Sequence, residues 1–452
     1  MNRSKPASWV KLLAGTAALS LALVACGSED DEPEGSAEES PSASESASEP
    51  AAGEVTDDPC AASDTSANAF KVGGILPVTG NLAFLGPPEI AGVGLAVSDI
   101  NAAGGVNGAQ ACHQIEDSGD TSDLAVSSNS ADKLIQGQPS VVIGAASSSV
   151  TENVVQTFTD AKITEVSPAN TATSLSGVSP FYFRTVVPDS VQGNALATLI
   201  AGDGYQKLAF LVFNDTYGTG LRNEIEKNFT ANGGTCTYGC KGDGNEFPAN
   251  QTTFSAEVSA ALATNPDAIM ILAFDETKAI IPELNNQNWD MSKVYLSDGN
   301  TSNYSEDLPP GSMEGAQGTV PGADAAPEVK EKLNAWNTLV NGEELNDFSY
   351  AAESYDAVIL AALAAVRGGA NDSVTVKDNY AAVSGAAEGA EECTSFEDCV
   401  ALLEEDKEIK YSGPSGIGPL NEQNDPESGY VGIFAYDETN ANSLSTTIEG
   451  VS

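Results

Sequence analysis

The stretch FKVGGILPV, residues 70–78, is followed after a short connection by EIAGVGLAVSDINAAGG, residues 89–105. The first piece is an almost uninterrupted apolar run, which predicts a buried strand. The second piece is predominantly apolar and small over the length of a helix and ends in two glycines, which predicts a helix and its stop. A strand followed by such a helix predicts one unit of a parallel sheet.

The same alternation of strand and helix patterns continues in two runs, which meet near SPFYFRTVV at residues 179–187. Further strands are predicted at CHQIED (112–117), SVVIGAA (140–146), ITEVSP (163–168), KLAFLVFND (207–215), DAIMILAF (267–274) and KVYLSD (293–298). A long Ala-rich helix at residues 350–369 and a last strand, YVGIFAYDE at residues 430–438, follow. We therefore predict an α/β fold with two doubly wound parallel-sheet lobes. Ligands of such sheets bind outside the carboxyl ends of the strands.

The N-terminus has the features of an export signal. Arg3, Lys5 and Lys11 accompany an apolar segment at residues 12–25, which is too short to span a hydrocarbon core of about 30 Å. Its end, LVAC at residues 23–26, resembles a bacterial lipobox, in which the cysteine carries the lipid. We expect a lipoprotein signal peptide at residues 1–25 and lipidation of Cys26. An ordinary signal peptide with an incidental cysteine is the alternative.

Residues 26–59 contain twelve acids and no Lys or Arg, and almost nothing apolar larger than Ala. Such a segment cannot bury enough surface to offset the entropy of ordering, so we expect a disordered acidic tether. Removing a leader of net charge +3 and a tether of net charge −12 from the total of −46 leaves −37 on the body. This charge argues against binding to nucleic acid or docking on anionic lipid, both of which need basic surfaces.

Seven cysteines minus the expected lipidated one leave six, an even number that suits an oxidising compartment. Cys236 and Cys240 are close in sequence, as are Cys393 and Cys399, so local pairs are expected at these positions. Cys60 and Cys112 would then pair, and would tie the segment before the first strand to the second strand. Six cysteines allow fifteen connectivities, so this pairing is a hypothesis.

Catalytic and metal-binding patterns are weak in this chain. His113 is the only histidine and falls at a strand start, the end of a strand away from ligand sites, so we expect a structural role for it. A His-based metal site is excluded, and a Ser-His-Asp triad would have to use this residue. No P-loop occurs, and YGTGLRNE, residues 217–224, lacks the third glycine of a dinucleotide motif. We expect no enzyme activity, no cofactor and no metal, and a surface hydrolase is the disfavoured alternative.

Two strand ends carry hydroxyl groups suited to a small anion. GAASSSVTEN, residues 144–153, places three serines between a strand and a helix, and its SVTE piece fits a capping box. A helix N-terminus offers free N–H groups and partial positive charge, which suit a carboxylate. The next strand ends in SPANTATSL, residues 167–175, with further hydroxyls. Helix capping alone would explain the first motif, whereas two such turns together favour an anion site.

These motifs, in their order along the chain, resemble the leucine/isoleucine/valine-binding protein family. The resembling blocks are GILPVTGNLAFLG (74–86), GVGLAVSDINAAGGVNG (92–108), VIGAASSSVTENV (142–154), ITEVSPANTATSL (163–175), FNDTYGTGL (213–221) and ESYDAVILAALA (353–364). The resemblance implies a type I periplasmic binding protein fold with a hinge and a central cleft. It also implies the substrate-binding component of an ABC importer for branched-chain amino acids.

The resemblance also implies the ligand contacts. Ser148 and Thr171 would bind the ligand carboxylate, and the Ala169 carbonyl and Asp298 would bind its ammonium. The family usually has Glu at the last position, and Asp is one methylene shorter. Tyr217 and Leu85 match positions that line the cleft. Phe274 stands where the family often has Tyr, and Asp275 follows it as an extra acid near the ammonium or as the mark of a different ligand.

The implied organisation divides the body into four parts. Residues 60–187 and 318–413 would form the first lobe, and residues 188–317 and 414–452 the second. The protein would be a monomer, held outside the cell membrane by its lipid, with permease and ATPase subunits as partners. Alternatives are the same fold with another ligand (an amide, urea, a short peptide or an aromatic acid) and a sensor that signals to a membrane kinase.

Overall fold

The computed structural model describes residues 55–452 except residues 61–67, 250 and 323. The described residues all belong to one compact unit. The expected signal peptide, the expected lipidation site Cys26 and the tether up to residue 54 lie outside the described residues. In the described part of the chain, no single helix is long and apolar enough to cross a membrane, although α9 (Ala351–Gly368) and α10 (Ser373–Val383) meet that test as a pair bent by 105°.

The first lobe contains a five-stranded parallel sheet with the strand order β2-β1-β3-β4-β5. Its strands are β1 (Phe70–Leu76), β2 (Ala111–Asp117), β3 (Val141–Gly144), β4 (Glu165–Ser167) and β5 (Tyr182–Arg184). The central position of β1 follows from its sequence, because every residue except Lys71 is apolar or Gly and nearly all are buried. The predicted parallel α/β architecture is confirmed for this lobe.

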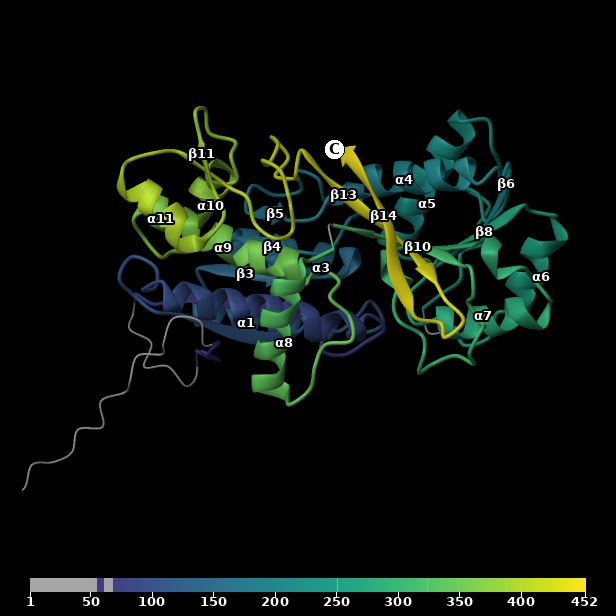
Figure 1. Ribbon diagram of the computed structural model, residues 1–452, viewed down its shortest axis with the longest axis horizontal. Coiled ribbons are helices and arrows are strands. Elements are labelled where there is room, and N and C mark those ends of the chain that lie inside the picture. Colours follow the sequence, from purple (N-terminus) through teal and green to yellow (C-terminus); the bar gives the residue numbers. More distant parts are fainter. Residues whose placement is uncertain (1–54, 61–67, 250, 323) are drawn as a thin grey trace, which may run out of the picture. The chain divides into compact units, whose positions relative to one another are not determined.

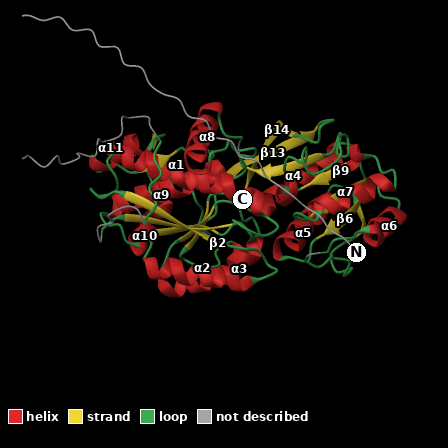
Figure 2. Cartoon of the chain, turned by 90° about the horizontal axis from the view of Figure 1, so that it is seen from below, coloured by secondary structure: helices red, strands yellow, loops and turns green. Residues whose placement is uncertain are grey.

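Helices cover both faces of the first sheet, as Figure 2 shows. The helices of this lobe are α1 (Gly86–Ala102), α2 (Leu124–Gly137), α3 (Ser148–Ala161), α8 (Pro327–Asn341), α9, α10 and α11 (Phe396–Glu404). Side chains alternate along β1, so Val72 packs against α1 and α9, whereas Ile75 packs against α2 and α3. The apolar run that decides the fold is therefore buried on both sides.

The second lobe contains a seven-stranded sheet with the order β14-β13-β10-β9-β8-β6-β7. Its strands are β6 (Lys207–Val212), β7 (Thr235–Tyr238), β8 (Ala268–Leu272), β9 (Val294–Leu296), β10 (Gln317–Pro321), β13 (Ser428–Tyr436) and β14 (Asn442–Val451). Its helices, α4 (Asp189–Gly202), α5 (Thr216–Ala231), α6 (Ser255–Ala263) and α7 (Thr277–Asn286), share one core with the sheet. A separate pair, β11 (Glu391–Cys393) and β12 (Ile409–Tyr411), packs near α9, α10 and α11.

Two features of the second lobe differ from the prediction. The strand predicted at residues 430–438 is β13, but it is not the last strand, because β14 pairs with it in an antiparallel hairpin (Figure 1). The sequence of β14, NSLSTTIEGV, has few large apolar residues because it lies at a half-exposed sheet edge.

The predicted lobe boundary after residue 317 is also wrong, because β10 pairs with β9 and β13 up to Pro321. The sequence QGTVP contains Gly and Pro, so its strand signal is weak.

The chain crosses between the lobes three times, after β5, after β10 and between β12 and β13. The two other boundaries expected, after residues 187 and 413, fall in the first and third of these connections. One ion pair joins two of the crossings. Arg184, fully buried at the end of β5, donates from Nε to Asp425 Oδ1 at 2.7 Å, and Asp425 lies in the third crossing.

Residues 55–60, which we call the N-terminal strap, lie against the first lobe, so the disorder expected up to residue 59 is wrong for residues 55–59. Cys60 forms a disulfide with Cys112 of β2, and the other two disulfides join Cys236 to Cys240 and Cys393 to Cys399, the same pairs that the sequence suggested. His113 Nε2 lies 2.9 Å from Asp57 Oδ1, so the histidine holds the strap. Trp336 of α8 also donates to the Thr56 carbonyl.

Candidate functional site

A small cavity lies where residues that follow strands of both sheets come together. It has a volume of about 20 Å³, which is room for about one water molecule. Its lining residues are Leu82, Leu85, Ala146, Ser147, Ser148, Ala169, Asn170, Thr171, Tyr217, Phe274, Asp298, Gly299 and Tyr350. The structure therefore brings together seven of the eight expected ligand contacts, and Asp275 is the exception.

The first side of the cavity is the N-terminus of α3, directly after β3. The N-cap is Ser147, whose hydroxyl accepts from the Val150 N–H at 3.4 Å, so the capping box expected to start at Ser149 is wrong. Ser149 instead accepts from the backbone N–H of Thr216 in the second lobe, at 3.2 Å. The hydroxyl of Ser148 accepts from the N–H of Ala172 at 3.3 Å, which joins α3 to the next turn.

That next turn, residues 169–172, follows β4 and is held by buried polar side chains. Asn170 donates to Thr151 Oγ1 at 2.7 Å and to the Ala145 carbonyl at 3.0 Å, and Arg184 donates to the Ala172 carbonyl at 3.0 Å. Thr171 is fully buried and lines the cavity, and its hydroxyl lies close enough to the Asp189 carboxylate to lower the pKa of that acid. The turn thus presents the Thr171 hydroxyl to the cavity.

The opposite side is Asp298, in the short 3-10 turn that follows β9. Its carboxylate accepts from Tyr217 Oη at 2.5 Å, from Gln192 Nε2 at 2.8 Å and from Tyr350 Oη at 2.8 Å. Burial raises the pKa of Asp298 above its ordinary value, and these three hydrogen bonds limit the rise. The acid is therefore buried and held in one orientation by neutral donors.

Aromatic rings and leucines form the remaining wall. Tyr217, one residue inside the start of α5, stacks on Phe274 with ring centroids 5.6 Å apart and planes 14° from parallel. Leu82 and Leu85 are buried on the facing side, in the turn that leads into α1. These surfaces suit an apolar side chain.

Asp275 does not reach this cavity. Its side chain is 57% exposed and pairs with Lys278 at 2.8 Å, in a neighbouring cavity of about 400 Å³ that shares Phe274 and Gly299. The expectation of an extra acid near the ammonium is therefore corrected. Phe274 and Asp275 lie in the turn between β8 and α7, and only Phe274 is buried there.

Tyr350 and Gln192 were not among the residues expected from the sequence. Tyr350 is the N-cap of α9 and has a left-handed backbone, with φ of 62°. Its hydroxyl links α9 of the first lobe to Asp298 of the second lobe. Gln192 lies one turn into α4, away from any strand end. Neither position follows a strand directly or lies in the blocks that carry the family resemblance, so neither signal pointed to them.

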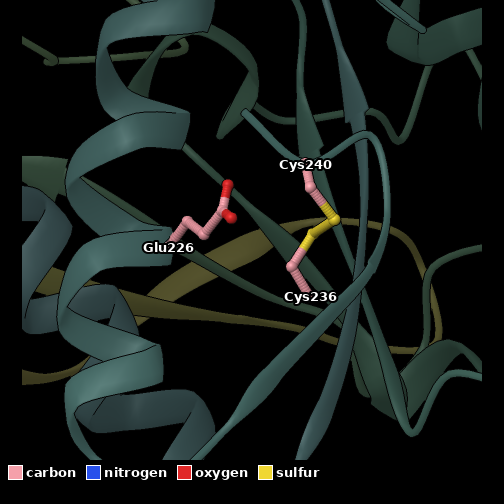
Figure 3. A group of neighbouring side chains, drawn as sticks. All are labelled: Glu226, Cys236 and Cys240. Carbon is pink, nitrogen blue, oxygen red and sulfur yellow. A yellow bond between two sulfur atoms is a disulfide. The ribbon is translucent and has the colours of Figure 1, made fainter. Parts of the chain in front are cut away.

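One group of side chains has the spacing of a metal site, namely Glu226, Cys236 and Cys240, whose ligand atoms lie within 4.8 Å of one another. Figure 3 shows that the two cysteines are joined by a disulfide, so neither is a thiolate ligand. Glu226 accepts from the N–H of Lys241 at 2.7 Å. This group is therefore explained as a structural one, and the absence of metal and cofactor stays a prediction.

A family model described as "Periplasmic binding protein" matches residues 69–399. The chain is 32% identical over 164 residues to the leucine-, isoleucine-, valine-, threonine-, and alanine-binding protein of Pseudomonas aeruginosa, a segment covering 36% of this chain and 43% of that relative. It is 26% identical over 381 residues to the chemotactic signal transduction system substrate-binding protein BasB of Halobacterium salinarum, covering 80% and 85%. The leucine binding protein LivK of Thermotoga maritima superimposes with a TM-score of 0.68 at 21% identity, covering 84% and 98%, which shows a shared fold.

Proposed function

Because the chain belongs to the periplasmic binding protein family, we propose that it captures a small amino acid between its lobes and delivers it to the permease of an ABC importer. Branched-chain amino acids are the first candidates. The observation that carries the proposal is one buried cavity with hydroxyls and a helix N-terminus on one side and a carboxylate on the other. The ammonium and carboxylate groups of an α-amino acid are attached to one carbon atom, so each can face the side of opposite polarity.

Each side has a role in the proposal. Ser148 and Thr171, with the N–H groups at the start of α3, bind the ligand carboxylate. The Ala169 carbonyl and Asp298 bind the ammonium group. The rings of Tyr217 and Phe274 contact the ligand side chain, together with the leucines described above.

The lobes must separate for a ligand to enter, because a cavity of about 20 Å³ has no room for an amino acid. Three contacts hold the closed form across the cleft. Tyr350 donates to Asp298, and Thr216 of α5 donates from its N–H to Ser149 and from its hydroxyl to Glu152 at 2.8 Å. A ligand that adds contacts to both lobes shifts the equilibrium towards the closed form, which the permease then binds.

The test is a thermal-shift screen of the purified protein against amino acids, small amides and aromatic acids. A ligand at a hundred times its Kd adds about 2.7 kcal/mol of stability. This raises the unfolding temperature by a few degrees. A shift with leucine, isoleucine or valine supports the proposal. A shift with an aromatic acid or an amide alone, and none with any amino acid, overturns the ligand assignment.

A sensor of the same ligand is the second candidate, because the BasB relative, named for chemotactic signalling, is matched over 85% of its length. Uptake of labelled ligand by cells with and without the protein separates the two. Loss of uptake in cells lacking the protein supports transport. Unchanged uptake with a lost behavioural response to the ligand supports sensing.

Anchoring through Cys26 is part of the same proposal, and it rests on the sequence motif at residues 23–26. A lipid on this cysteine would keep the binding protein near its permease and raise its effective concentration. Replacement of the cysteine, Cys26→Ala, should move the protein from the membrane fraction to the soluble fraction. Unchanged fractionation would contradict the anchor.

A further inference from the structure

A second cavity, which we call the hinge cavity, lies between the lobes and shares Tyr350 with the candidate site. It has a volume of about 320 Å³, and small-molecule sites usually have about 300–1,000 Å³. The first lobe contributes residues 346–350 and Glu353 of α9, and the second lobe contributes residues of β10, β13 and β14. The hinge cavity is therefore large enough for a small molecule that would contact both lobes.

Glu353 is a buried acid of the hinge cavity with no assigned role. The residue is 3% exposed, and its Oε1 atom has no hydrogen-bond partner among the described residues. Burial raises the pKa of Glu353 well above the ordinary value, its own backbone N–H opposes the rise, and the charge of Asp356 adds to it. A buried carboxylate oxygen without a partner is costly, so this atom indicates a donor that binds in the cavity.

Glu353 also lies where the connections between the lobes meet. Its carbonyl accepts from the hydroxyl of Thr185, in the first crossing, at 2.9 Å. Its Oε1 atom lies against Gly322, in the second crossing, where a Cβ atom would be only 2.1 Å away. The N–H of Gly322 donates at 2.7 Å to the carbonyl of Tyr430, in the strand that follows the third crossing. A ligand of Glu353 would therefore bind at the hinge itself.

The charges of the hinge cavity favour a cation. Three acids line it, namely Asp324, Asp347 and Glu353, and one base, Lys330. Lys330 Nζ pairs with Asp324 Oδ1 at 2.6 Å and lies 5.3 Å from the ring centroid of Phe348. These contacts direct Lys330 to Asp324 and Phe348, so Glu353 retains the need for a positive partner.

The walls of the hinge cavity favour an organic cation over a metal ion. Within the described parts of the chain, its carboxylates do not form a group with the spacing of a metal site. Phe348, Phe434 and Leu444 supply apolar surface that suits the carbon atoms of an organic ligand. Aromatic faces also attract ammonium and guanidinium groups.

We propose that the hinge cavity is a second binding site, which takes a small organic cation, an amine or a guanidinium, with Glu353 as its anchor. This goes beyond the proposed function, because the hinge cavity is separate from the cavity assigned to the amino acid. Both lobes line the hinge cavity, so a cation bound there stabilises the closed arrangement of the lobes.

The experiment is calorimetry of the full protein with methylammonium, 1,4-diaminobutane and methylguanidinium as probes. At least one of them should bind, and 1,4-butanediol, the neutral counterpart of the diamine, should not. Glu353→Gln should weaken binding at least about tenfold, because a charge-assisted hydrogen bond is lost, and should keep the unfolding temperature. The matched control is Glu165→Gln, which changes another buried acid of the first lobe outside the hinge cavity and should leave binding within twofold.

Absence of binding by all three organic cations overturns the inference, and so does binding of potassium or calcium ions alone. Equal binding by the parent protein and Glu353→Gln reports a general attraction to the acidic surface and also overturns it. These measurements use no amino acid, so they are independent of the thermal-shift screen that tests the proposed function. Small-angle scattering should show a smaller radius of gyration when the cation is added, and an unchanged or larger radius would contradict the effect on closure.

Discussion

The two sides of the candidate site are built in different ways. The hydroxyl side, formed by Ser148 and the turn at residues 169–172, is fixed by hydrogen bonds within the first lobe. The acid side depends on a contact between the lobes, because Tyr350 of α9 donates to Asp298 of the second lobe. The hydroxyl side therefore keeps its geometry when the lobes separate, whereas the acid side loses one of its three donors.

This difference assigns separate tasks to the two sides. Under the proposed function, the preformed hydroxyl side would bind the ligand carboxylate in the open form at little cost in conformational entropy. The ammonium group would then add donors and positive charge at Asp298, which Tyr350 of the other lobe also contacts. Closure would therefore be linked to the positive charge of the ligand more than to its size.

The largest effect is expected from removing the support of the hydroxyl side. Arg184→Met leaves Asp425 buried without its partner, and breaking a buried ion pair costs about 3–5 kcal/mol. Urea denaturation should show this loss, and leucine binding should weaken because the turn at residues 169–172 loses its Arg184 donor. Lys227→Met is the control, because its pair with Glu224 is exposed and is worth at most about 1 kcal/mol. Equal losses for the two variants would contradict the expected difference.

The next largest effect is expected from the charge of the acid side. Asp298→Asn should weaken amino-acid binding about ten- to a hundredfold, because a charge-assisted hydrogen bond is worth about 1.5–3 kcal/mol. Calorimetry measures the change. Asp275→Asn provides the matched control, since that acid is exposed and outside the cavity, and its affinity should stay within twofold. A larger loss for the control than for Asp298→Asn would reverse the assignment.

Lowering the pH should weaken the acid side of the site by protonating Asp298. The pKa of Asp298 is raised by burial, so the ligand-free site takes up a proton at a pH above the ordinary aspartate range. Amino-acid affinity should then fall by up to about tenfold per pH unit below that pKa. The stability of the ligand-free protein should change in the opposite sense, because a raised pKa favours the folded form as pH falls.

Titrations of affinity from pH 8 to pH 4 check this prediction. The titratable groups beside Asp298 are Asp189, Tyr217 and Tyr350, and burial raises the pKa of each. Asp298→Asn should flatten the profile. A profile that is steeper in the variant would contradict the prediction.

The smallest effect is expected from the contact between the lobes. Tyr350→Phe removes one hydrogen bond, worth about 1 kcal/mol, from the closed form without ligand. Small-angle scattering should show a larger radius of gyration for the ligand-free variant, and affinity should fall several-fold. Tyr436→Phe removes a hydroxyl that donates to the Ser302 carbonyl, away from the cavity, and should leave the radius unchanged. The same radius for Tyr350→Phe and the parent would show that this contact does not hold the lobes together.

The meeting of the two hydroxyl-rich turns at one cavity could be predicted from the sequence because a local rule places them. Ser148 and Thr171 follow β3 and β4 directly, and the carboxyl ends of neighbouring parallel strands meet at one edge. The resemblance, and not this rule, pointed to Asp298 and Tyr217, which follow β9 and β6. Asp275 was one of two alternatives, an extra acid near the ammonium or the mark of a different ligand, and it lies outside the cavity.

Other residues depend on the return path of the chain, which no local rule gives. Tyr350 is 52 residues from Asp298 and arrives beside it only after the second crossing between the lobes. Asp189 and Gln192 lie in the first turn of a helix, where an acid is most simply explained as helix capping. The edge strand β14 was missed because backbone pairing, not an apolar face, holds it in the sheet.

The N-terminal strap has a consequence for how load is transmitted through the molecule. The Cys60–Cys112 disulfide ties the strap covalently to β2, so a pull on the chain upstream of Cys60 reaches the body at the first lobe. His113 and Trp336 hold the same segment to the same lobe. If the chain is held from its N-terminus, the load would therefore fall on the first lobe, and the second lobe, with the acid side of the site, could move without opposing that load.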